Sequence, residues 1–478
     1  MSRFPRLRSC AGRARLVVVG LVLGMLGAFA RGDEQGIVRE IEAFFRTDRP
    51  TERARLARRI AADPDFLREK VSHWLHEADL FPSLRPGRRR MTVSIDAGDS
   101  RVVTLRIPAG YDPHRPWPLI YALHGTGGDA ESILRYVERV LGDGIDAFVI
   151  AAPSGYQQVV IHGATPPSRE HPAILAAVRR KVHIDSDRVY ATGYSRGGHA
   201  CWTLAVLDPD AFAGVMPVAG TLILPEREVM FELLAPNLAR TCVFACWGAG
   251  DVTGPDLTTR SPDGGIAGIN HKLCRVAAQR RLPVRWYEVP DKGHGGIVPP
   301  ADDVRRLLTR RRPPPPVHVR QVFRLPYQGR AAWIEAHHWR GSWWNDRPLA
   351  LRFRKGENRN DPAVRRAATA RALRGVLGEL RGDIEGQDIR VYRRKISELT
   401  VWIPTGAIDW TRPVTLKVNG RRVFADKLSP DLLVCLTQAA RTYDFSRLRW
   451  AGLRFKSGSR TRPVTGSTPF PAPAVTPP

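Results

Sequence analysis

Residues 188–202 read RVYATGYSRGGHACW, and this stretch decides the fold. An apolar run typical of a buried strand leads into the G-x-S-x-G motif around Ser195, and small and apolar residues at helical spacing follow it. A serine on a tight strand-to-helix turn needs Gly193 and Gly197, because side chains there would collide with neighbouring elements. The stretch therefore predicts a strand, a sharp turn that presents Ser195, and a helix. The simpler alternative is a serine that caps a helix after an ordinary strand.

Apolar strands alternate with helical stretches on both sides of this turn. The further strands are expected at 118–123, 147–153, 214–219, 241–247 and 284–289. Continuous apolar strands separated by helices are typical of a mostly parallel sheet that helices cover on both faces. We therefore expect residues 89–312 to form one domain of the α/β class.

A serine hydroxyl becomes a good nucleophile when a histidine, itself oriented by a carboxylate, takes its proton. In this architecture the acid and then the histidine follow the serine along the chain. Asp251 comes just after the strand expected at 241–247, and His294 comes just after the strand expected at 284–289. Because the carboxyl ends of parallel strands open on one edge of a sheet, both loops should lie beside Ser195. The sequence therefore predicts a catalytic triad of Ser195, Asp251 and His294.

Other residues compete less well for the roles of acid and base. Asp256 could replace the acid, although it lies five residues further from the strand end. The remaining candidates stand in unsuitable places: His199 within the helix after the nucleophile, His271 at a helix start, and Asp291 too near the histidine to orient its ring.

Acyl transfer also needs donors for a developing oxyanion, and backbone N–H groups are expected to serve. One should come from Arg196, the residue after the nucleophile. The second should come from Thr126, in the run His124-Gly125-Thr126-Gly127-Gly128 that follows an apolar strand, because glycines let a backbone approach a substrate closely. The rival is His162-Gly163, which leads into ATPPS rather than into a helix.

The strings LHGTGG, GYSRGGHACW, WGAGD and PDKGHGG, in this order, resemble the α/β-hydrolase fold. They are especially similar to the secreted esterases grouped with polyhydroxybutyrate depolymerases and with feruloyl and acetylxylan esterases. The similarity covers roughly residues 95–310. It implies Ser195 as nucleophile, Asp251 as acid, His294 as base and Thr126 and Arg196 as oxyanion donors, with His124, Gly125, Gly193 and Gly197 as supporting motif positions. Arg196 and the segment GDVTGPD depart from the usual pattern, which affects the expected shape of the pocket more than the mechanism.

These observations predict a secreted serine hydrolase that cleaves carboxylic esters through a covalent acyl-enzyme, with no metal or organic cofactor. One alternative is a serine peptidase of the prolyl-oligopeptidase type, because one triad serves esters and amides. The chain before residue 90 is too short for the propeller domain of such a peptidase. The other alternative is a binding protein with a catalytically idle hydrolase-like domain, against which the complete triad argues. Residues 153–172 are expected to wall the substrate pocket.

Residues 1–30 combine five arginines with an apolar run that ends in Ala28-Phe29-Ala30. This pattern is typical of a secretory signal peptide with an A-x-A cleavage site. An anchoring helix is the alternative, but the apolar run of 15 residues is short for one. We therefore expect a secreted or periplasmic protein with no transmembrane segment after cleavage. Residues 31–88 carry helical spacing and predict a small helical segment before the α/β domain.

The chain changes character after residue 312. Four consecutive prolines at 313–316 cannot continue a helix or a central strand, and they predict a stiff linker. We expect residues 317–456 to form a β-rich accessory domain, with strands that include PLALRF and one helix capped by Asp361. Residues 457–478 are dominated by Ser, Gly, Thr and Pro and predict a disordered tail.

The net charge is +27, of which +5 lies in residues 1–30 and +17 lies in residues 317–478. The arginines are dispersed and the protein is expected to be exported, so a nucleic acid is not an expected partner. A solvated basic face or adhesion to an anionic polymer fits better. The seven tryptophans of residues 317–456 either fill the core or, at Trp343 and Trp344, form a platform for a polysaccharide or anionic polymer. Because the proline run is expected to separate the two domains and the predicted triad lies wholly before it, a chain that ends at Arg312 is expected to remain active on a small soluble ester.

The cysteines give no sign of a disulfide scaffold or a zinc site. Six are present, and five remain once Cys10 leaves with the signal peptide, so at least one thiol is unpaired. The sequence has no C-x-x-C motif, and Cys242 and Cys246 fall on one expected strand, too far apart to be bridged. We interpret these residues as small buried hydrophobic side chains.

Overall fold

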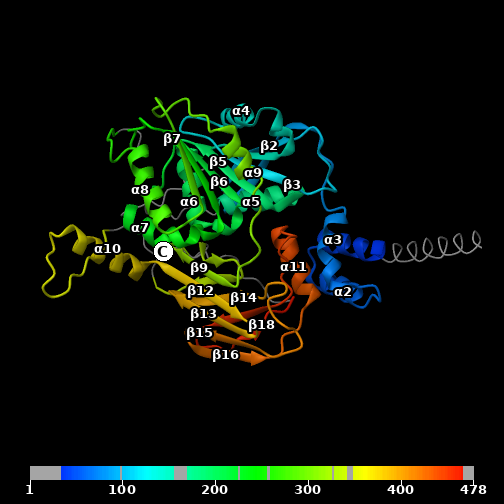
Figure 1. Ribbon diagram of the computed structural model, residues 1–478. Coiled ribbons are helices and arrows are strands. Elements are labelled where there is room, and N and C mark those ends of the chain that lie inside the picture. Colours follow the sequence, from blue (N-terminus) through cyan, green and yellow to red (C-terminus); the bar gives the residue numbers. More distant parts are fainter. Residues whose placement is uncertain are drawn as a thin grey trace, which may run out of the picture. The chain divides into compact units, whose positions relative to one another are not determined.

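A computed structural model describes residues 34–96, 99–155, 170–223, 227–255, 259–325, 328–341 and 348–466 (Figure 1). The expected signal peptide lies outside these residues, as does most of the loop expected to wall the pocket. Contacts divide the chain into two units, Met1–Leu80 and Phe81–Pro478. Among the described residues, no helix combines the length and the apolar character needed to cross a bilayer.

The first unit is helical, as its spacing predicted. It contains a helix over 34–46, α2 (Pro50–Ala61), the short 3-10 helix η1 (Arg68–Lys70) and α3 (Val71–Glu77). The predicted stripe of Ile37, Ile41 and Phe44 is buried. The helical segment ends before residue 88, because strand β1 already begins at Gly87.

An eight-stranded sheet forms the framework of the second unit. Its strands are β1 (Gly87–Asp96), β2 (Asp99–Ile107), β3 (Trp117–Leu123), β4 (Val149–Pro153), β5 (Ile184–Tyr194), β6 (Gly214–Val218), β7 (Cys242–Gly248) and β8 (Val284–Val289), in the order β1-β2-β4-β3-β5-β6-β7-β8. β1 pairs with β2 and β2 with β4 in antiparallel fashion, and every other neighbouring pair is parallel. The predicted mostly parallel sheet is confirmed.

Helices follow the strands and cover both faces of this sheet. They are α4 (Ala130–Leu141), α5 (Glu170–Lys181), α6 (Arg196–Leu207), α7 (Arg227–Leu234), α8 (Ile266–Gln279) and α9 (Ala301–Leu308), with the 3-10 helices η2 (Gly142–Ala147), η3 (Pro209–Ala211) and η4 (Ala235–Arg240). Successive residues of a strand point to opposite faces. Thus Leu119 and Tyr121 of β3 belong to the core with α5, α6 and α8, whereas Ile120 belongs to the core with α4 and α9.

Two five-stranded sheets follow the proline run. One has the order β10-β11-β14-β17-β18 and the other the order β16-β15-β13-β12-β9. Their strands are β9 (His318–Phe323), β10 (Arg330–Ala331), β11 (Ile334–Trp339), β12 (Gly378–Glu385), β13 (Asp388–Arg394), β14 (Ile396–Trp402), β15 (Val414–Val418), β16 (Arg421–Asp426), β17 (Gly452–Lys456) and β18 (Arg462–Pro463), with helices α10 (Pro362–Val376) and α11 (Leu432–Thr442). One apolar cluster joins both sheets, and the buried rings of Trp333 and Trp402 lie within it.

Several expectations for this region are confirmed and others are wrong. Asp361 caps α10 as predicted, accepting hydrogen bonds from the N–H groups of Ala363 and Val364. The segment PLALRF forms no strand, and α11 was not expected. The disordered tail was expected from residue 457, but Arg462–Pro463 pairs with β17 as β18. Trp343 and Trp344 lie outside the described residues, as do residues 467–478.

The residues after the prolines share a core with the α/β sheet. Val322 of β9 and Leu373 and Leu377 at the end of α10 belong to the apolar cluster that contains α5, α6 and α8. The buried Asn237 side chain donates to the carbonyl oxygen of Val322 at 2.7 Å and accepts from its N–H at 2.9 Å. Arg312, just before the prolines, donates to Asp187 at 3.0 Å and to Asp444 at 2.7 Å. The prolines therefore do not separate two domains that pack independently.

Candidate active site

Ser195 occupies a strained turn between β5 and α6. Its φ of 55° and ψ of −114° lie in a region that non-glycine residues seldom adopt, at a cost of about 1–3 kcal/mol. Hydrogen bonds hold the turn: the Ser195 N–H donates to the Val218 carbonyl oxygen at 2.8 Å, and the His199 N–H donates to the Ser195 carbonyl oxygen at 2.9 Å. Because the surrounding backbone fixes this conformation, the hydroxyl is presented at the carboxyl end of β5.

The glycines of the motif are required by close backbone packing, as the sequence predicted. A Cβ atom on Gly197 would lie 2.0 Å from the carbonyl oxygen of Leu123, and one on Gly193 would lie 2.8 Å from the same atom. Real Cβ contacts are not this short, so either side chain would force the turn away from the end of β3. The simpler interpretation of Ser195, as a helix cap, does not fit, because its side chain makes no capping hydrogen bond.

The structure brings Ser195, His294 and Asp251 into one chain of hydrogen bonds. The Ser195 Oγ atom lies 2.8 Å from His294 Nε2, and His294 Nδ1 lies 2.9 Å from Asp251 Oδ2. Asp251 is fully buried, and its other carboxylate oxygen accepts from the N–H of Thr253 at 3.1 Å. A carboxylate accepts only, so Nδ1 carries the proton and Nε2 is left to accept from the serine hydroxyl.

Two loops that lock together position the acid and the histidine. The loop after β7 and the loop after β8 are joined by the Ala249 N–H, which donates to Val289 at 3.0 Å, and by the Gly250 N–H, which donates to Lys292 at 2.9 Å. A Cβ atom on Gly248 would lie 2.3 Å from the Lys292 carbonyl oxygen, so only glycine permits this approach. The loops therefore hold their two polar side chains at one edge of the sheet.

Tyr194 is a positioning residue that the sequence reasoning missed. Its hydroxyl donates to the carbonyl oxygen of His294 at 2.7 Å, and its ring packs at an angle against the imidazole. The residue stands inside the G-x-S-x-G motif, immediately before the serine, but no sequence pattern connects its side chain to the distant histidine loop. This contact ties the serine turn directly to the loop that carries the imidazole.

The segment after β3 approaches the serine, as expected for an oxyanion loop. The Cβ position of Gly125 lies 3.5 Å from the Cβ of Ser195. His124 shapes this loop, because its Nε2 accepts from the Gly155 N–H at 3.3 Å and its Nδ1 lies 2.8 Å from the Gly125 carbonyl oxygen. Thr126 follows in this loop. Its N–H remains a predicted oxyanion donor, as does the N–H of Arg196 at the start of α6.

The competing residues lie elsewhere or in other roles. His199 is buried in α6, where its Nδ1 lies 2.8 Å from the Thr221 N–H, and burial lowers its pKa to about 4. His271 is an exposed residue of α8 that pairs with Glu288. Asp291 occupies the turn before the histidine with a positive φ of 54°. Asp256 and His162-Gly163 lie outside the described residues.

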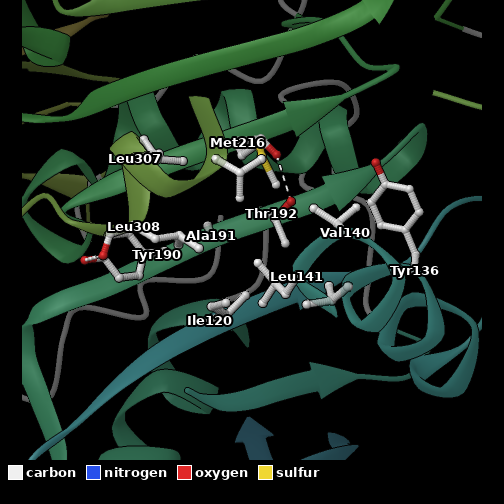
Figure 2. Close-up of a pocket in the computed structure, with 12 residues that line it drawn as sticks. Ile120, Tyr136, Val140, Leu141, Tyr190, Ala191, Thr192, Met216, Leu307 and Leu308 are labelled. Carbon is white, nitrogen blue, oxygen red and sulfur yellow. Dashed lines mark hydrogen bonds between the residues drawn. The ribbon is translucent and has the colours of Figure 1, made fainter. Parts of the chain in front are cut away.

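The described residues contain no group of three or more His, Cys, Asp or Glu side chains that could hold a metal ion. A separate apolar pocket lies between the sheet and helices α4 and α9 (Figure 2). Ile120, Tyr190 and Met216 line it, and the only hydrogen bond drawn there runs from the Thr192 hydroxyl to the Met216 carbonyl oxygen at 3.0 Å. Ser195, Asp251 and His294 do not line this pocket.

No family model matches the chain. It is 36% identical over 127 residues to NocK of Nocardia uniformis subsp. tsuyamanensis, which is named as an esterase, covering 23% of this chain and 35% of NocK. It is 28% identical over 148 residues to feruloyl esterase C of Emericella nidulans, covering 28% of this chain and 51% of that enzyme. The chain resembles curated esterases. It spans about a third to a half of the length of these relatives.

Among solved structures, the chain is similar to LpqC, a poly(3-hydroxybutyrate) depolymerase of Bordetella parapertussis. That likeness has a TM-score of 0.34 at 21% identity and covers 47% of this chain and 95% of the other. A thermostable esterase gives a TM-score of 0.36 at 20% identity, over 47% of this chain and 63% of the other. The predicted resemblance to esterases of the α/β-hydrolase group is confirmed by the curated relatives.

Proposed function

We propose that this protein is a secreted serine hydrolase that cleaves carboxylic esters through a covalent acyl-enzyme. The observation that carries the proposal is the continuous hydrogen-bonded chain from Ser195 through His294 to the buried Asp251, with the serine on a strained turn. Nucleophile, base and orienting acid in this order are the parts that acyl transfer requires. The similarity to curated esterases supports an ester rather than an amide substrate.

The geometry fits a two-step reaction. His294 Nε2 takes the proton of the Ser195 hydroxyl as its oxygen attacks the ester carbonyl, and the buried Asp251 carboxylate holds the imidazole in the required tautomer and stabilises its charged form. The imidazolium then protonates the departing alcohol. A water molecule, deprotonated by the same imidazole, hydrolyses the acyl-enzyme. Both tetrahedral intermediates place their oxyanion on the N–H groups of Arg196 and Thr126.

The other parts of the proposal rest on the sequence. Residues 1–30 support export, since they have the pattern of a signal peptide. The names of the curated relatives support an ester of an aromatic acid such as ferulate as the first substrate to examine. Binding of a polysaccharide or anionic polymer through residues 317–456 stays a proposal, supported by the charge of +17 over residues 317–478.

The test combines covalent labelling with turnover of a small soluble ester. A fluorophosphonate should label the wild-type protein once. Ser195→Ala should abolish this labelling and lower kcat by at least about 10⁴-fold, because the attacking oxygen is gone. Ser94→Ala, at an exposed position of β1, is the matched control and should behave like wild type. Thermal unfolding verifies that both variants fold. Labelling or near-wild-type turnover by folded Ser195→Ala would refute the proposal.

A further inference from the structure

The histidine loop, residues 290–300 between β8 and α9, has few side chains that could hold it in place around His294. Residues 293, 295 and 296 are exposed glycines, and a Cβ atom on Gly295 or Gly296 would meet no atom of the described residues within 4 Å. Gly296 has a φ of 69°, in the region that glycine adopts most easily. Glycine also loses the most conformational freedom on folding. The position of the imidazole therefore depends on contacts that other elements make with this loop.

Two tyrosine hydroxyls, those of Tyr136 and Tyr194, hold the backbone of the histidine loop. Tyr194 donates to the carbonyl oxygen of His294 at 2.7 Å, and Tyr136 donates to that of Ile297 at 3.1 Å. The two rings pack against each other at an angle of 67°, with their centroids 5.3 Å apart. Ile297 is itself fully buried, in the core that α4 and α9 share with the sheet. This tyrosine pair therefore holds residues 294–297 at both ends.

The two tyrosines belong to elements that carry other parts of the candidate site. Tyr194 is the last residue of β5 and directly precedes Ser195. Tyr136 lies on α4, which begins directly after the segment 124–128 that is predicted to supply an oxyanion donor. A capping box at Asp129 joins this segment to the helix. The tyrosine pair thus connects the nucleophile turn, the histidine loop and the helix behind the expected oxyanion loop.

The hydroxyl groups make this connection, and they can be removed without removing the rings. The ring of Tyr136 lines the apolar pocket between the sheet and helices α4 and α9 (Figure 2), and phenylalanine would keep that packing. Burial raises the pKa of both tyrosines, so both hydroxyls stay protonated and able to donate near neutral pH. A change from tyrosine to phenylalanine therefore measures the hydrogen bond to the loop separately from the packing.

We propose that the tyrosine pair is a clamp that positions His294 against Ser195. This inference rests on the proposed hydrolase function, because it assigns a role within the same site. His294 Nε2 must stay within hydrogen-bonding distance of Ser195 Oγ, from which it now lies 2.8 Å, in order to take the proton. A misplacement of about 1 Å can cost about 10²-fold in rate, so the smaller displacement that follows loss of one hydroxyl should cost about 10-fold.

The experiment follows fluorophosphonate labelling over time in wild type, Tyr136→Phe, Tyr194→Phe and the double variant. Each single variant should label completely but about 10-fold more slowly, because the imidazole is less often in place to take the serine proton. The kcat for a small soluble ester should fall by a similar factor. KM should change by less than about 2-fold, because the same imidazole serves acylation and deacylation. The double variant should lose less than the product of the two single losses, since both hydroxyls hold one loop.

The matched control is Tyr190→Phe. The hydroxyl of the buried Tyr190 lies 2.7 Å from the carbonyl oxygen of Leu308, so this change removes a similar hydrogen bond at the end of α9 rather than in the histidine loop. It should lower the midpoint of thermal unfolding as Tyr136→Phe does, but label at the wild-type rate. Wild-type labelling rates in the folded single variants, an equal slowing in Tyr190→Phe, or a double-variant loss equal to the product would overturn the proposal. Failure of wild type to label at Ser195 would refute the proposed hydrolase function, and this inference with it.

Discussion

Removing residues 313–478 should unfold the α/β sheet domain rather than release it as an active fragment. The truncation takes Val322, Leu373 and Leu377 out of the core that α5, α6 and α8 share with the sheet. Burial of one such side chain contributes about 1.5–3 kcal/mol, so roughly 5–9 kcal/mol is lost with these three. A domain is stable by only about 5–15 kcal/mol in total.

Polar groups add to this loss. Asn237 is fully buried and exchanges two hydrogen bonds with the backbone of Val322, at 2.7 and 2.9 Å. A buried polar group left without its partner costs about 1–3 kcal/mol. Arg312 would lose Asp444 and keep only its contacts to Asp187 and Asp210. This reverses the expectation, drawn from the proline run alone, that a chain ending at Arg312 remains active.

The assay compares residues 31–312 with residues 31–478 by thermal unfolding and by turnover of a small soluble ester. We expect the short chain to lack a cooperative transition at the temperature of the long one. In the full chain, Asn237→Ala should lower the free energy of unfolding by about 1–3 kcal/mol, because it leaves the Val322 N–H and carbonyl without partners. The exposed Asn360→Ala should change it by less than about 0.5 kcal/mol. A short chain that unfolds within about 2 °C of the long one would refute the reasoning.

Two further predictions concern backbone packing and pH. Gly197→Ala should lower the free energy of unfolding by about 1–3 kcal/mol or more and abolish turnover, because its Cβ would lie 2.0 Å from a backbone oxygen. Gly375→Ala in α10 is the control: its Cβ would meet no atom within 4 Å, so it should raise the free energy of unfolding by up to about 1 kcal/mol. Chemical denaturation measures both values, and equal effects of the two substitutions would contradict this prediction. The pH prediction concerns Glu379. Burial alone would raise the pKa of this carboxyl group, but the hydrogen bond from Arg381 and the charge of Arg320 hold it below its ordinary value of 4.5. The stabilisation from these ion pairs is present above pH 4.5 and is lost as the pH falls through the lowered pKa. The difference in free energy of unfolding between wild type and Glu379→Gln should therefore be largest near neutral pH and shrink below pH 4.5. A difference that grows in acid would contradict the prediction.

The sequence was sufficient to predict that these three side chains lie together, because the strands that precede them belong to the parallel part of the sheet. Each acid or histidine followed an apolar strand, and the carboxyl ends of parallel strands meet at one edge, so Ser195, Asp251 and His294 could be placed without knowing any loop conformation. The hydroxyl of Tyr194 could not be placed in this way. Its partner is the backbone of a loop 100 residues away, and a carbonyl oxygen leaves no trace in the sequence.

The errors beyond residue 312 have two physical causes. PLALRF alternates like a strand, but alternation gives a strand only where a neighbouring strand is available to pair with it. Helix α11 was missed although Asp431 caps it by accepting from the Val434 N–H at 3.1 Å, because its apolar run is as compatible with a strand as with a helix. The proline run predicts a linker between two separate domains, but proline restricts the backbone only locally. The side chains on either side of the run still pack together.

Strand β5 links the nucleophile turn to the ion pairs of the residues around the proline run. Its carboxyl end leads into Ser195, and its amino end carries Asp187, which Arg312 joins to Asp444. Residues beyond the prolines therefore support the strand that presents the nucleophile, but none of them belongs to the chain of hydrogen bonds at Ser195. Their loss should reduce the fraction of folded molecules rather than the turnover of each folded one. Titration of active sites with a fluorophosphonate separates the folded fraction from the turnover of each folded molecule, since it counts only molecules whose serine is activated. Turnover per labelled site should stay constant while the number of labelled sites falls.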